Sequence, residues 1–443
     1  MVVATYNVAP YIDAFFDSLL AQTAGLDVLE IIVVNDGSTD GSGAIAAERA
    51  RRHPDLIRCI DQTNQGVCAA RNAGLRAARG DWICFPDPDD VISADYLAQM
   101  LEEIDRPQDR PLLAVVANMV SHYEQTGQTV DDHPLRFRFA RGVQRRDSTD
   151  PGTFVVAHTT STFMRRAEIA AQDLWFDPAV RPSFEDAHFI MRLAIGAPGR
   201  TISFLPGPVY TYRKRAAQDS LMNNVAQDRA WFAPHLRTAY LPLIAAALAQ
   251  RGRVPVFVQC GILVSLLGKL RHLTGPHHDP DRLDDAQKRA FLDAMAEVMA
   301  HIDAQTIREV RLRGLKDMHR IALLGREKGA RLSPLPVTIT AVVPQDGGLR
   351  VQLRWFSGGT DRITVALTLD GTIAPVTEVT QTRTDLLGTP YLCETALWVQ
   401  MAEGQVLAGR VDGADVVFRR GGTVVGSQVT ATALAGSADG KAV

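Results

Sequence analysis

Three aspartates stand close together directly after a short apolar run, and their chemistry suits a metal-assisted reaction. Asp87, Asp89 and Asp90 follow the run Trp82–Phe85. Carboxylates at this spacing repel one another unless a cation compensates their charge. Mg²⁺ and Mn²⁺ bind through one or two carboxylates together with substrate phosphates. The pattern therefore predicts a site for Mn²⁺ or Mg²⁺ and a diphosphate, and a solvated turn is the alternative.

A second acidic pair, Glu185 and Asp186, opens an amphipathic helix that we expect to reach about Ile195. Negative charge in the first turn of a helix is favoured by the helix dipole. The pair therefore has a structural explanation before any chemical one is considered.

Strands and helices alternate through the first hundred residues, and polar residues appear where the strands end. We expect strands at 2–5, 31–34, 57–60 and 82–85. We also expect helices between them, the clearest of which repeats apolar residues every three to four positions from Ile12 to Leu20. Such alternation predicts a parallel, doubly wound sheet, which binds ligands at the carboxyl ends of its strands. The fold class is therefore α/β, with a Rossmann-like, mostly parallel sheet.

The loop Asp36–Ser42 begins like a calcium-binding loop, but it lacks that loop's essential glutamate. The twelfth position is Ala47, and the loop follows a strand rather than a helix. A dinucleotide-binding glycine fingerprint is also absent after the first strand. Two interpretations of this loop therefore remain: a turn that caps a helix, and a contact with a nucleotide.

Five short motifs carry a family resemblance. They are Ala4–Asn7, Val34–Asp40, Asn64–Gly66, Ala70–Gly74 and Asp87–Asp90. In this order they resemble the successive motifs of family 2 glycosyltransferases with the GT-A fold. The resemblance covers roughly residues 1–220 and implies a GT-A catalytic domain that uses a nucleotide-sugar donor, most simply a UDP-linked one.

The resemblance implies a donor-binding role for residues at several strand ends. Thr5, together with Asn7, and Asp36 would hold the nucleotide base. Asn64 and Arg71 would approach the rest of the donor.

The same resemblance implies roles for the acidic residues. Asp87 and Asp89 would form the Asp-x-Asp motif that contacts the ribose and holds a metal on the diphosphate. Asp186, paired with Glu185, would be the general base that takes the proton of the acceptor hydroxyl. The basic segment that contains Arg213, Arg215 and Ser220 would fold over the diphosphate, because guanidinium groups bind phosphate in a bidentate way. The alternative to this donor-binding role is that the basic segment is only a solvent-exposed surface.

Composition narrows the classes of partner and compartment. The net charge of −3 gives no basic face for nucleic acid. The five cysteines form no C-x-x-C pair, which favours a reducing compartment without a disulfide framework. No secretory signal is visible, so we expect a cytoplasmic protein. The apolar run Val254–Leu267 is shorter than the roughly 18 residues of a membrane span and reads as a buried helix. Its basic flanks leave peripheral contact with the inner face of the membrane open; they are Arg251, Arg253, Lys269 and Arg271.

Four regions differ in their pattern. We expect a GT-A domain at 1–223, a helical linker domain at 224–330, a β-sandwich domain at 335–428 and a disordered tail at 429–443. This layout resembles the transferases that decorate bacterial wall teichoic acid, and it implies a homo-oligomer assembled by the C-terminal domain. The predicted function is an inverting, metal-dependent transfer of a sugar to a hydroxyl of a polymeric glycan or polyol-phosphate acceptor. The alternative is a non-catalytic carbohydrate-binding or assembly subunit on the same fold.

Overall fold

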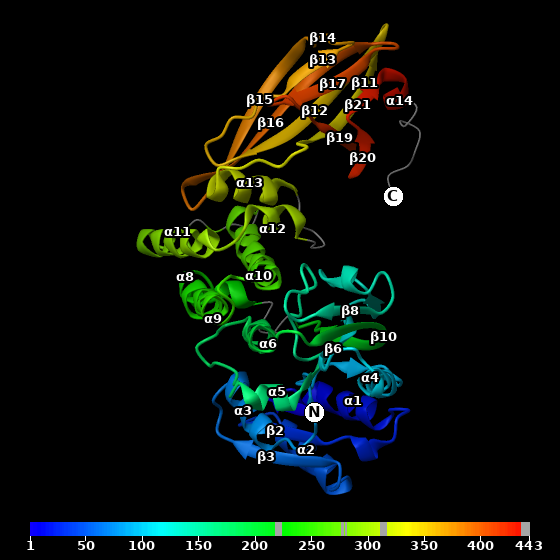
Figure 1. Ribbon diagram of the computed structural model, residues 1–443, viewed down its shortest axis with the longest axis vertical. Coiled ribbons are helices and arrows are strands. Elements are labelled where there is room, and N and C mark those ends of the chain that lie inside the picture. Colours follow the sequence, from blue (N-terminus) through cyan, green and yellow to red (C-terminus); the bar gives the residue numbers. More distant parts are fainter. Residues whose placement is uncertain (218–223, 276–278, 280, 311–316, 436–443) are drawn as a thin grey trace. The chain divides into compact units, whose positions relative to one another are not determined.

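The computed structural model describes residues 1–217, 224–275, 279, 281–310 and 317–435 (Figure 1). It divides into two compact units. Unit 1 comprises Met1–Lys269, Arg282–Ile302 and Val310–Gly314, and unit 2 comprises Leu270–Asp281, Asp303–Glu309 and Leu315–Val443. The region 224–330, expected as a separate helical linker, contributes helices to both units.

Unit 1 begins with a three-stranded parallel sheet in the order β1-β2-β3, as predicted. Its strands and helices are β1 (Val2–Thr5), α1 (Ala9–Leu20), β2 (Ile31–Asp36), α2 (Ser42–Arg52), β3 (Ile57–Gln62) and α3 (Val67–Ala77). The apolar stripe predicted on α1 is fully buried: Ile12, Phe15, Phe16 and Leu19. Val2 N donates to Cys84 O at 3.0 Å, which places the residues after β4 (Trp82–Ile83) beside β1.

The second sheet of unit 1 is mixed, and its main path runs β4-β9-β6-β10-β5. Its elements are β5 (Val91–Ile92), α4 (Tyr96–Asp105), β6 (Leu112–Tyr123), β7 (Gln128–Val130), β8 (Gln144–Asp147), β9 (Thr162–Arg165), α5 (Arg166–Ala171), α6 (Glu185–Gly196) and β10 (Thr201–Lys214). Only β6 and β10 pair in parallel, whereas β5, β7, β8 and β9 pair antiparallel with their neighbours. The parallel arrangement is therefore confirmed for β1–β3, and the antiparallel strands were not foreseen.

The stretch Ala69–Arg79 is rich in strong helix formers and is followed by Gly80, so its sequence predicts a helix that ends on a left-handed glycine. The helix is present as α3, but the predicted glycine cap is wrong. α3 ends at Ala77, and Gly80 is not among the glycines with positive φ. Arg58 on β3 donates to the Ala77 carbonyl at 2.7 Å. A neighbouring strand's side chain thus satisfies the last turn, so a left-handed glycine is not needed there.

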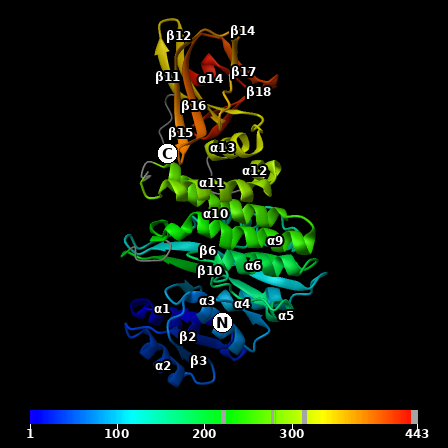
Figure 2. The ribbon, with the colours of Figure 1, turned by 90° about the vertical axis from the view of Figure 1, so that its left-hand side faces the viewer.

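The helical region continues unit 1 and leads into unit 2 (Figure 2). Its helices are α8 (Ala233–His235), a π-helical turn at Leu236–Tyr240, α9 (Leu241–Arg251), α10 (Val256–Thr274), α11 (Asp285–Ala300), α12 (Ala304–Glu309) and α13 (Asp317–Lys328). In the part of the chain that the structure describes, α10 alone is long and apolar enough to cross a membrane, and 67% of its most apolar window is buried. The predicted helix is present and largely buried, but at 19 residues it is longer than the apolar run Val254–Leu267 from which it was predicted.

Two of the four basic residues that flank the apolar run Val254–Leu267 make contacts inside unit 1. Lys269 is fully buried. Arg251 donates to the carbonyls of Ile195 and Ala194 at 2.7 and 3.0 Å. These two side chains therefore add nothing to a free basic surface for a membrane.

Unit 2 contains two β-sheets. One runs β15-β16-β12-β11-β19-β20, and the other runs β14-β13-β17-β18 with β21 paired to β17. The strands are β11 (Pro336–Gln345), β12 (Gly348–Gly358), β13 (Ala366–Leu369), β14 (Thr372–Ile373), β15 (Val376–Leu386), β16 (Thr389–Ala402), β17 (Val406–Val411), β18 (Ala414–Asp415), β19 (Val417–Arg420), β20 (Thr423–Gly426) and β21 (Gln428–Thr430). Buried and less buried residues alternate along β12, as expected for a strand that turns one face toward the core.

The C-terminal tail is ordered further than expected. β21 and α14 (Ala431–Ala435) occupy part of the range 429–443 that was predicted to be disordered. Val429 and Leu434 are buried, so apolar contact holds this segment in place. Residues 436–443 lie outside the described part of the chain.

Candidate active site

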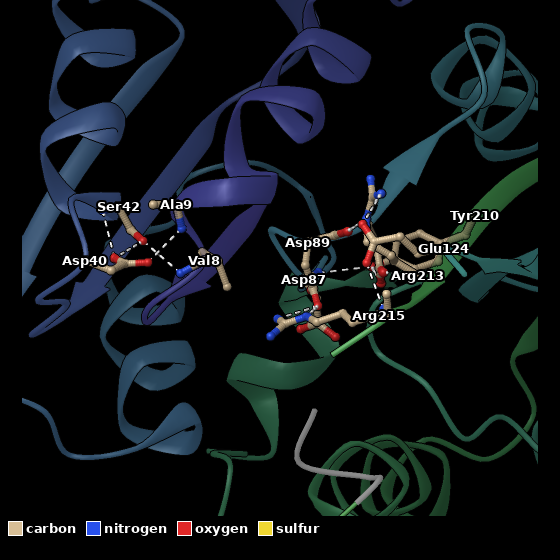
Figure 3. A network of polar contacts seen from close by, with 12 residues as sticks. Val8, Ala9, Asp40, Ser42, Asp87, Asp89, Glu124, Tyr210, Arg213 and Arg215 are labelled. Atoms are coloured by element: carbon tan, nitrogen blue, oxygen red, sulfur yellow. Dashed lines mark hydrogen bonds and ion pairs between the residues drawn. The ribbon is translucent and has the colours of Figure 1, made fainter. Parts of the chain in front are cut away.

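The predicted aspartate cluster follows β4, and each of its members meets a different partner (Figure 3). Asp87 Oδ1 accepts from Arg71 at 3.2 Å. Asp89 Oδ2 accepts two bonds from Arg215, from Nε at 3.0 Å and from a terminal nitrogen at 2.6 Å. Asp90 is buried, with 1% of its surface exposed. The cluster is therefore a set of paired carboxylates rather than a solvated turn.

Asp90 ties the end of β4 to β10. Its Oδ2 accepts from the Tyr210 hydroxyl at 2.7 Å, and its Oδ1 accepts from Arg213 N at 2.8 Å. The same hydroxyl accepts from Asp87 N at 3.0 Å. Burial raises the pKa of Asp90. Both oxygens of Asp90 are thus occupied, and its role is to position the neighbouring aspartates.

The predicted basic segment does reach the cluster. Arg213 Nε donates to the Asp89 carbonyl at 2.7 Å, next to the Arg215 contact (Figure 3). Both guanidinium groups lie over the ring of Tyr11, at 5.2 and 4.8 Å from its centroid. Ser220, which we predicted as part of this segment, lies outside the described residues.

Arg71 on α3 joins the two acidic groups of the sequence into one cluster. In addition to Asp87, it donates to Glu185 Oε1 at 3.2 Å and to Asp186 Oδ1 at 2.7 Å. Only 4% of its side chain is exposed. Burial disfavours the charged guanidinium, but the three carboxylates more than offset this and raise the pKa of Arg71. The side chain predicted to approach the donor is therefore a buried counter-ion for the acidic residues.

Asp186 is fixed at the start of α6 by two residues. Its Oδ1 accepts from Thr159 Oγ1 at 2.7 Å as well as from Arg71. Its Oδ2 accepts only one bond among the described residues, from Thr159 N at 3.2 Å. The side chain is 14% exposed. Asp186 Oδ2 thus retains a lone pair with which to accept a proton.

The pKa values of Glu185 and Asp87 are also raised in this arrangement. Burial and the charge of Asp186 raise the pKa of Glu185. Burial is also the main reason that the pKa of Asp87 rises to about 7, and Arg71 opposes this shift. The neighbouring carboxylates add to the effect of burial in both residues.

The charge balance fits a divalent cation. Of the five carboxylates at positions 87, 89, 90, 185 and 186, Arg71 pairs with three and Arg215 with one, whereas the guanidinium group of Arg213 pairs with Glu124. Among the described contacts, Asp87 Oδ2 and Asp89 Oδ1 accept no hydrogen bond. No group of three or more acidic, His or Cys ligands is assembled within the described residues. Two carboxylates plus a diphosphate, the set that Mg²⁺ and Mn²⁺ commonly use, fit this geometry.

The residues predicted to hold the nucleotide lie at the ends of β1, β2 and β3. Thr5 is fully buried, and its hydroxyl has no hydrogen-bond partner in the described structure. Asn7 adopts a left-handed φ of 51° and accepts from Thr39 N at 2.9 Å. Asn64 is exposed beside Gly37, where an added Cβ would lie 2.9 Å from Asn64 N. The buried hydroxyl of Thr5 is the group that most requires an external partner.

Asp36 holds the entrance to α3. Its carboxylate accepts from Gln62 Nε2 at 2.7 Å, Gln65 N at 2.9 Å and Gly66 N at 2.8 Å. Asp40, in the same loop, accepts from Ala9 N at 2.8 Å (Figure 3). The loop therefore caps helices, which was one of its two open interpretations, and a nucleotide contact by Asp36 stays a prediction.

Sequence reasoning missed Thr159, Tyr210 and Tyr11. Thr159 lies 27 residues before Asp186, so no local spacing could have linked them. Tyr210 lies on β10, and Asp90, the partner of its hydroxyl, lies 120 residues away in the sequence. Only the folded sheet brings these groups to the site.

Comparisons with known proteins find similarity to glycosyltransferases in part of the chain. Residues 1–170 match the sequence profile of Glycosyl transferase family 2. The minor teichoic acid biosynthesis protein GgaB of Bacillus subtilis is 28% identical over 311 residues, which cover 70% of this chain and 33% of that protein. The putative glycosyltransferase EpsH of Bacillus subtilis is 34% identical over 226 residues, which cover 48% of this chain and 60% of EpsH. The chain thus spans between a third and two thirds of these relatives.

Solved structures share the fold. The crystal structure of S. aureus TarS matches with a TM-score of 0.56 at 15% identity, over 95% of this chain and 78% of that one. Residues 1–349 of TarS in complex with UDP match with a TM-score of 0.51 at 18% identity, over 79% of this chain and 95% of that one. The overall architecture of a GT-A-type unit, helices and a C-terminal β-rich region is therefore confirmed.

Proposed function

We propose that the protein transfers a sugar from a nucleotide diphosphate sugar to a hydroxyl of a cell-surface glycopolymer, a function that the match of residues 1–170 to Glycosyl transferase family 2 supports. The observation that carries the proposal is Asp186, held by Arg71 and Thr159 with one oxygen available beside the aspartates after β4. A general base next to a diphosphate-binding cluster is what attack by a hydroxyl on an anomeric carbon requires.

Asp186 acts as the base in this proposal. Its Oδ2 accepts the proton of the acceptor hydroxyl, while Arg71 and Thr159 keep the carboxylate oriented. Attack from the side opposite the leaving diphosphate inverts the anomeric centre. Glu185 stays beside Asp186 as a second carboxylate on Arg71.

Asp87 and Asp89 would hold Mn²⁺ or Mg²⁺, which would neutralise charge on the leaving diphosphate. Arg213 and Arg215 lie on the same cluster and would pair with phosphate oxygens once the donor is present. Asp89 has one oxygen without a hydrogen bond among the described contacts, so it need not release Arg215 to accept a further ligand.

The nucleotide would lie across the strand ends that carry Thr5, Asn7, Asp36 and Asn64. The buried hydroxyl of Thr5 supports this placement because it has no partner within the described structure. UDP is the nucleotide that we propose, since TarS, which shares the fold, was crystallised with UDP and with UDP-GlcNAc. The teichoic acid biosynthesis proteins among the relatives support a polyol-phosphate polymer or a similar glycan as acceptor, in the cytoplasm.

Self-association through unit 2 is part of the proposal. β14 and β15 are edge strands of the two sheets, and Ile373 of β14 and Val376 of β15 are 86% and 43% exposed. Exposed apolar residues at a sheet edge favour association with another chain. A polymeric acceptor would bind several linked active sites at a high effective concentration.

A donor screen tests the proposed reaction. The protein is incubated with UDP-, GDP-, dTDP- and CDP-linked sugars, Mn²⁺ and a poly(glycerol phosphate) or poly(ribitol phosphate) acceptor. We expect nucleotide release that depends on the acceptor, and a new glycosidic bond whose anomeric configuration is inverted by NMR. Binding of polymer without transfer from any donor would favour the non-catalytic alternative, and a retained configuration would remove the single-base mechanism.

A further inference from the structure

A polar hollow of about 490 Å³ opens on unit 2, outside the residues of the proposed active site. Its wall is the loop Gly359–Arg362 together with Gln381 and Arg383 of β15 and Cys393 of β16. Small-ligand sites in proteins typically have volumes of roughly 300–1,000 Å³. The hollow is therefore large enough for a ligand of several heavy atoms.

Two polar side chains border the hollow from the edge strand β15. Gln381 pairs with Thr395, and Arg383 pairs with Cys393, in the antiparallel register of β15 and β16. Directly opposed residues of an antiparallel pair lie on the same face. Thr395 and Cys393 are buried, whereas Gln381 and Arg383 are exposed. The two side chains of β15 are therefore accessible to a ligand in the hollow.

The two arginines of the hollow have no counter-ion. Among the described contacts, neither Arg362 nor Arg383 makes a hydrogen bond or an ion pair, although both line the hollow. Asp361 is the carboxylate of the wall, and it is already paired with Arg331 at 3.6 Å. The hollow therefore carries positive charge that an anion can compensate.

The loop that carries Arg362 is held at both ends. Gly359 N donates to the Tyr391 carbonyl at 3.0 Å, and Trp355 Nε1 donates to the Ile363 carbonyl at 3.1 Å. Gly359 has a φ of +63°, and a Cβ there would lie 3.2 Å from the Cα of Arg326. The backbone of the wall is thus fixed before any ligand binds, which lowers the entropy cost of binding.

We propose that this hollow binds a phosphate group of a phosphorylated polyol. Arg362 and Arg383 donate to the phosphate oxygens, since guanidinium groups bind phosphate with two parallel bonds. Gln381 and Thr360 supply an amide and a hydroxyl for the neighbouring polyol hydroxyls. A phosphate-bearing chain held here would add a second attachment point on the acceptor, a consequence that rests on the proposed function.

Calorimetry on the full chain without any sugar donor tests the site. The probes are glycerol 3-phosphate, poly(glycerol phosphate), inorganic phosphate and neutral dextran. The variant is Arg362→Gln combined with Arg383→Gln, and the matched control is Arg410→Gln, an arginine of β17 paired with Asp415. We expect the double variant to bind the phosphate probes about tenfold more weakly or worse, because two charge-assisted contacts are lost, and the control to stay within about twofold of the wild type.

The same experiment distinguishes a polymeric polyol phosphate from a free one as the ligand of the hollow. Tighter binding of poly(glycerol phosphate) than of glycerol 3-phosphate, per phosphate, identifies a polymer, and equal binding identifies a free polyol phosphate. The proposal is overturned by equal affinities of the double variant and the wild type, by dextran binding as tightly as the phosphate probes, or by no binding to the wild type at millimolar concentration. Because no donor is present, a failure of the transfer reaction leaves this result unaffected.

Discussion

The carboxylates of the site depend on a small number of arginines, and Arg71 carries the largest share. It contacts Asp87, Glu185 and Asp186 from a buried position. Removing one partner from a buried ionic cluster leaves the remaining charges unpaired, which costs more than the cluster contributes when intact. Substitutions at Arg71 should therefore affect folding as well as turnover.

We predict that Arg71→Met lowers the free energy of unfolding by about 3–5 kcal/mol, the usual cost of breaking a buried charge cluster. Arg71→Lys should lose less, because it keeps the charge but cannot donate to three carboxylates at once. Urea unfolding measures both. Arg76→Met, an exposed arginine of the same helix, is the control and should stay close to the wild type. A stable Arg71→Met protein would mean that the cluster does not need this counter-ion.

The aspartates after β4 give the second prediction at this scale. Asp89→Ala should abolish the gain in UDP affinity that Mn²⁺ provides, because the cation loses a ligand on the protein side. Chelation of the metal by EDTA should lower UDP affinity in the wild type to the same level. Calorimetry with and without Mn²⁺ gives the comparison, and Asp55→Ala serves as an exposed control. If UDP affinity changes neither with the metal nor with the substitution, the cluster has only a structural role.

At the scale of elements, the sequence predicted what depends on local pattern. The buried stripe of α1, the parallel strands β1–β3 and the acidic start of α6 all follow from residue types at fixed spacing. The contacts that those elements make with distant parts of the chain cannot be predicted in this way. Arg58 replaces a glycine cap on α3 from another strand, and Thr159 reaches Asp186 from a distant loop. Both contacts arise from tertiary packing, which no single window of sequence encodes.

The helix α10 contains a buried lysine whose charge is costly. Lys269 donates to Tyr240 Oη at 3.1 Å and lies 4.5 Å from the centroid of Trp231. Burial lowers the pKa of Lys269 well below its usual value, and no carboxylate is among the causes. The protonated lysine is therefore less favourable in the folded chain than in the unfolded chain. At neutral pH this difference lowers the free energy of unfolding.

We predict that the stability of the wild type rises relative to Lys269→Met as the pH increases from 7 toward 10. The lysine of the unfolded chain loses its proton near pH 10.4, so the penalty shrinks as that value is approached. Each pKa unit of depression corresponds to about 1.4 kcal/mol. Thermal or urea unfolding of both proteins across this range measures the effect. A constant difference in stability would mean that Lys269 has an ordinary pKa in the fold.

At the scale of the whole molecule, the two units have distinct tasks in our account. Unit 1 contains the residues that match the profile of Glycosyl transferase family 2 and all the residues of the proposed active site. Unit 2 contains two sheets, an exposed edge strand and the polar hollow. These features of unit 2 suit contacts with other chains or with a long acceptor.

We predict that the full-length protein is an oligomer and that Ile373→Glu combined with Val376→Glu makes it a monomer. The two substitutions put charge on an exposed apolar edge, where association would have to desolvate it. Light scattering gives the oligomeric state. Val28→Glu, at a valine of unit 1 that is 61% exposed, should leave that state unchanged. A monomeric wild type would assign the edge strand another role.

The turnover of Asp186→Asn, measured beside its donor affinity, decides whether Asp186 is the base. The substitution keeps the size of the side chain but removes the base, so kcat should fall by about two to four orders of magnitude. UDP affinity in the presence of Mn²⁺ should stay near that of the wild type, because Asp186 is not among the donor ligands in our account. A variant with near-normal turnover would contradict the account, since another group would then take the proton of the acceptor.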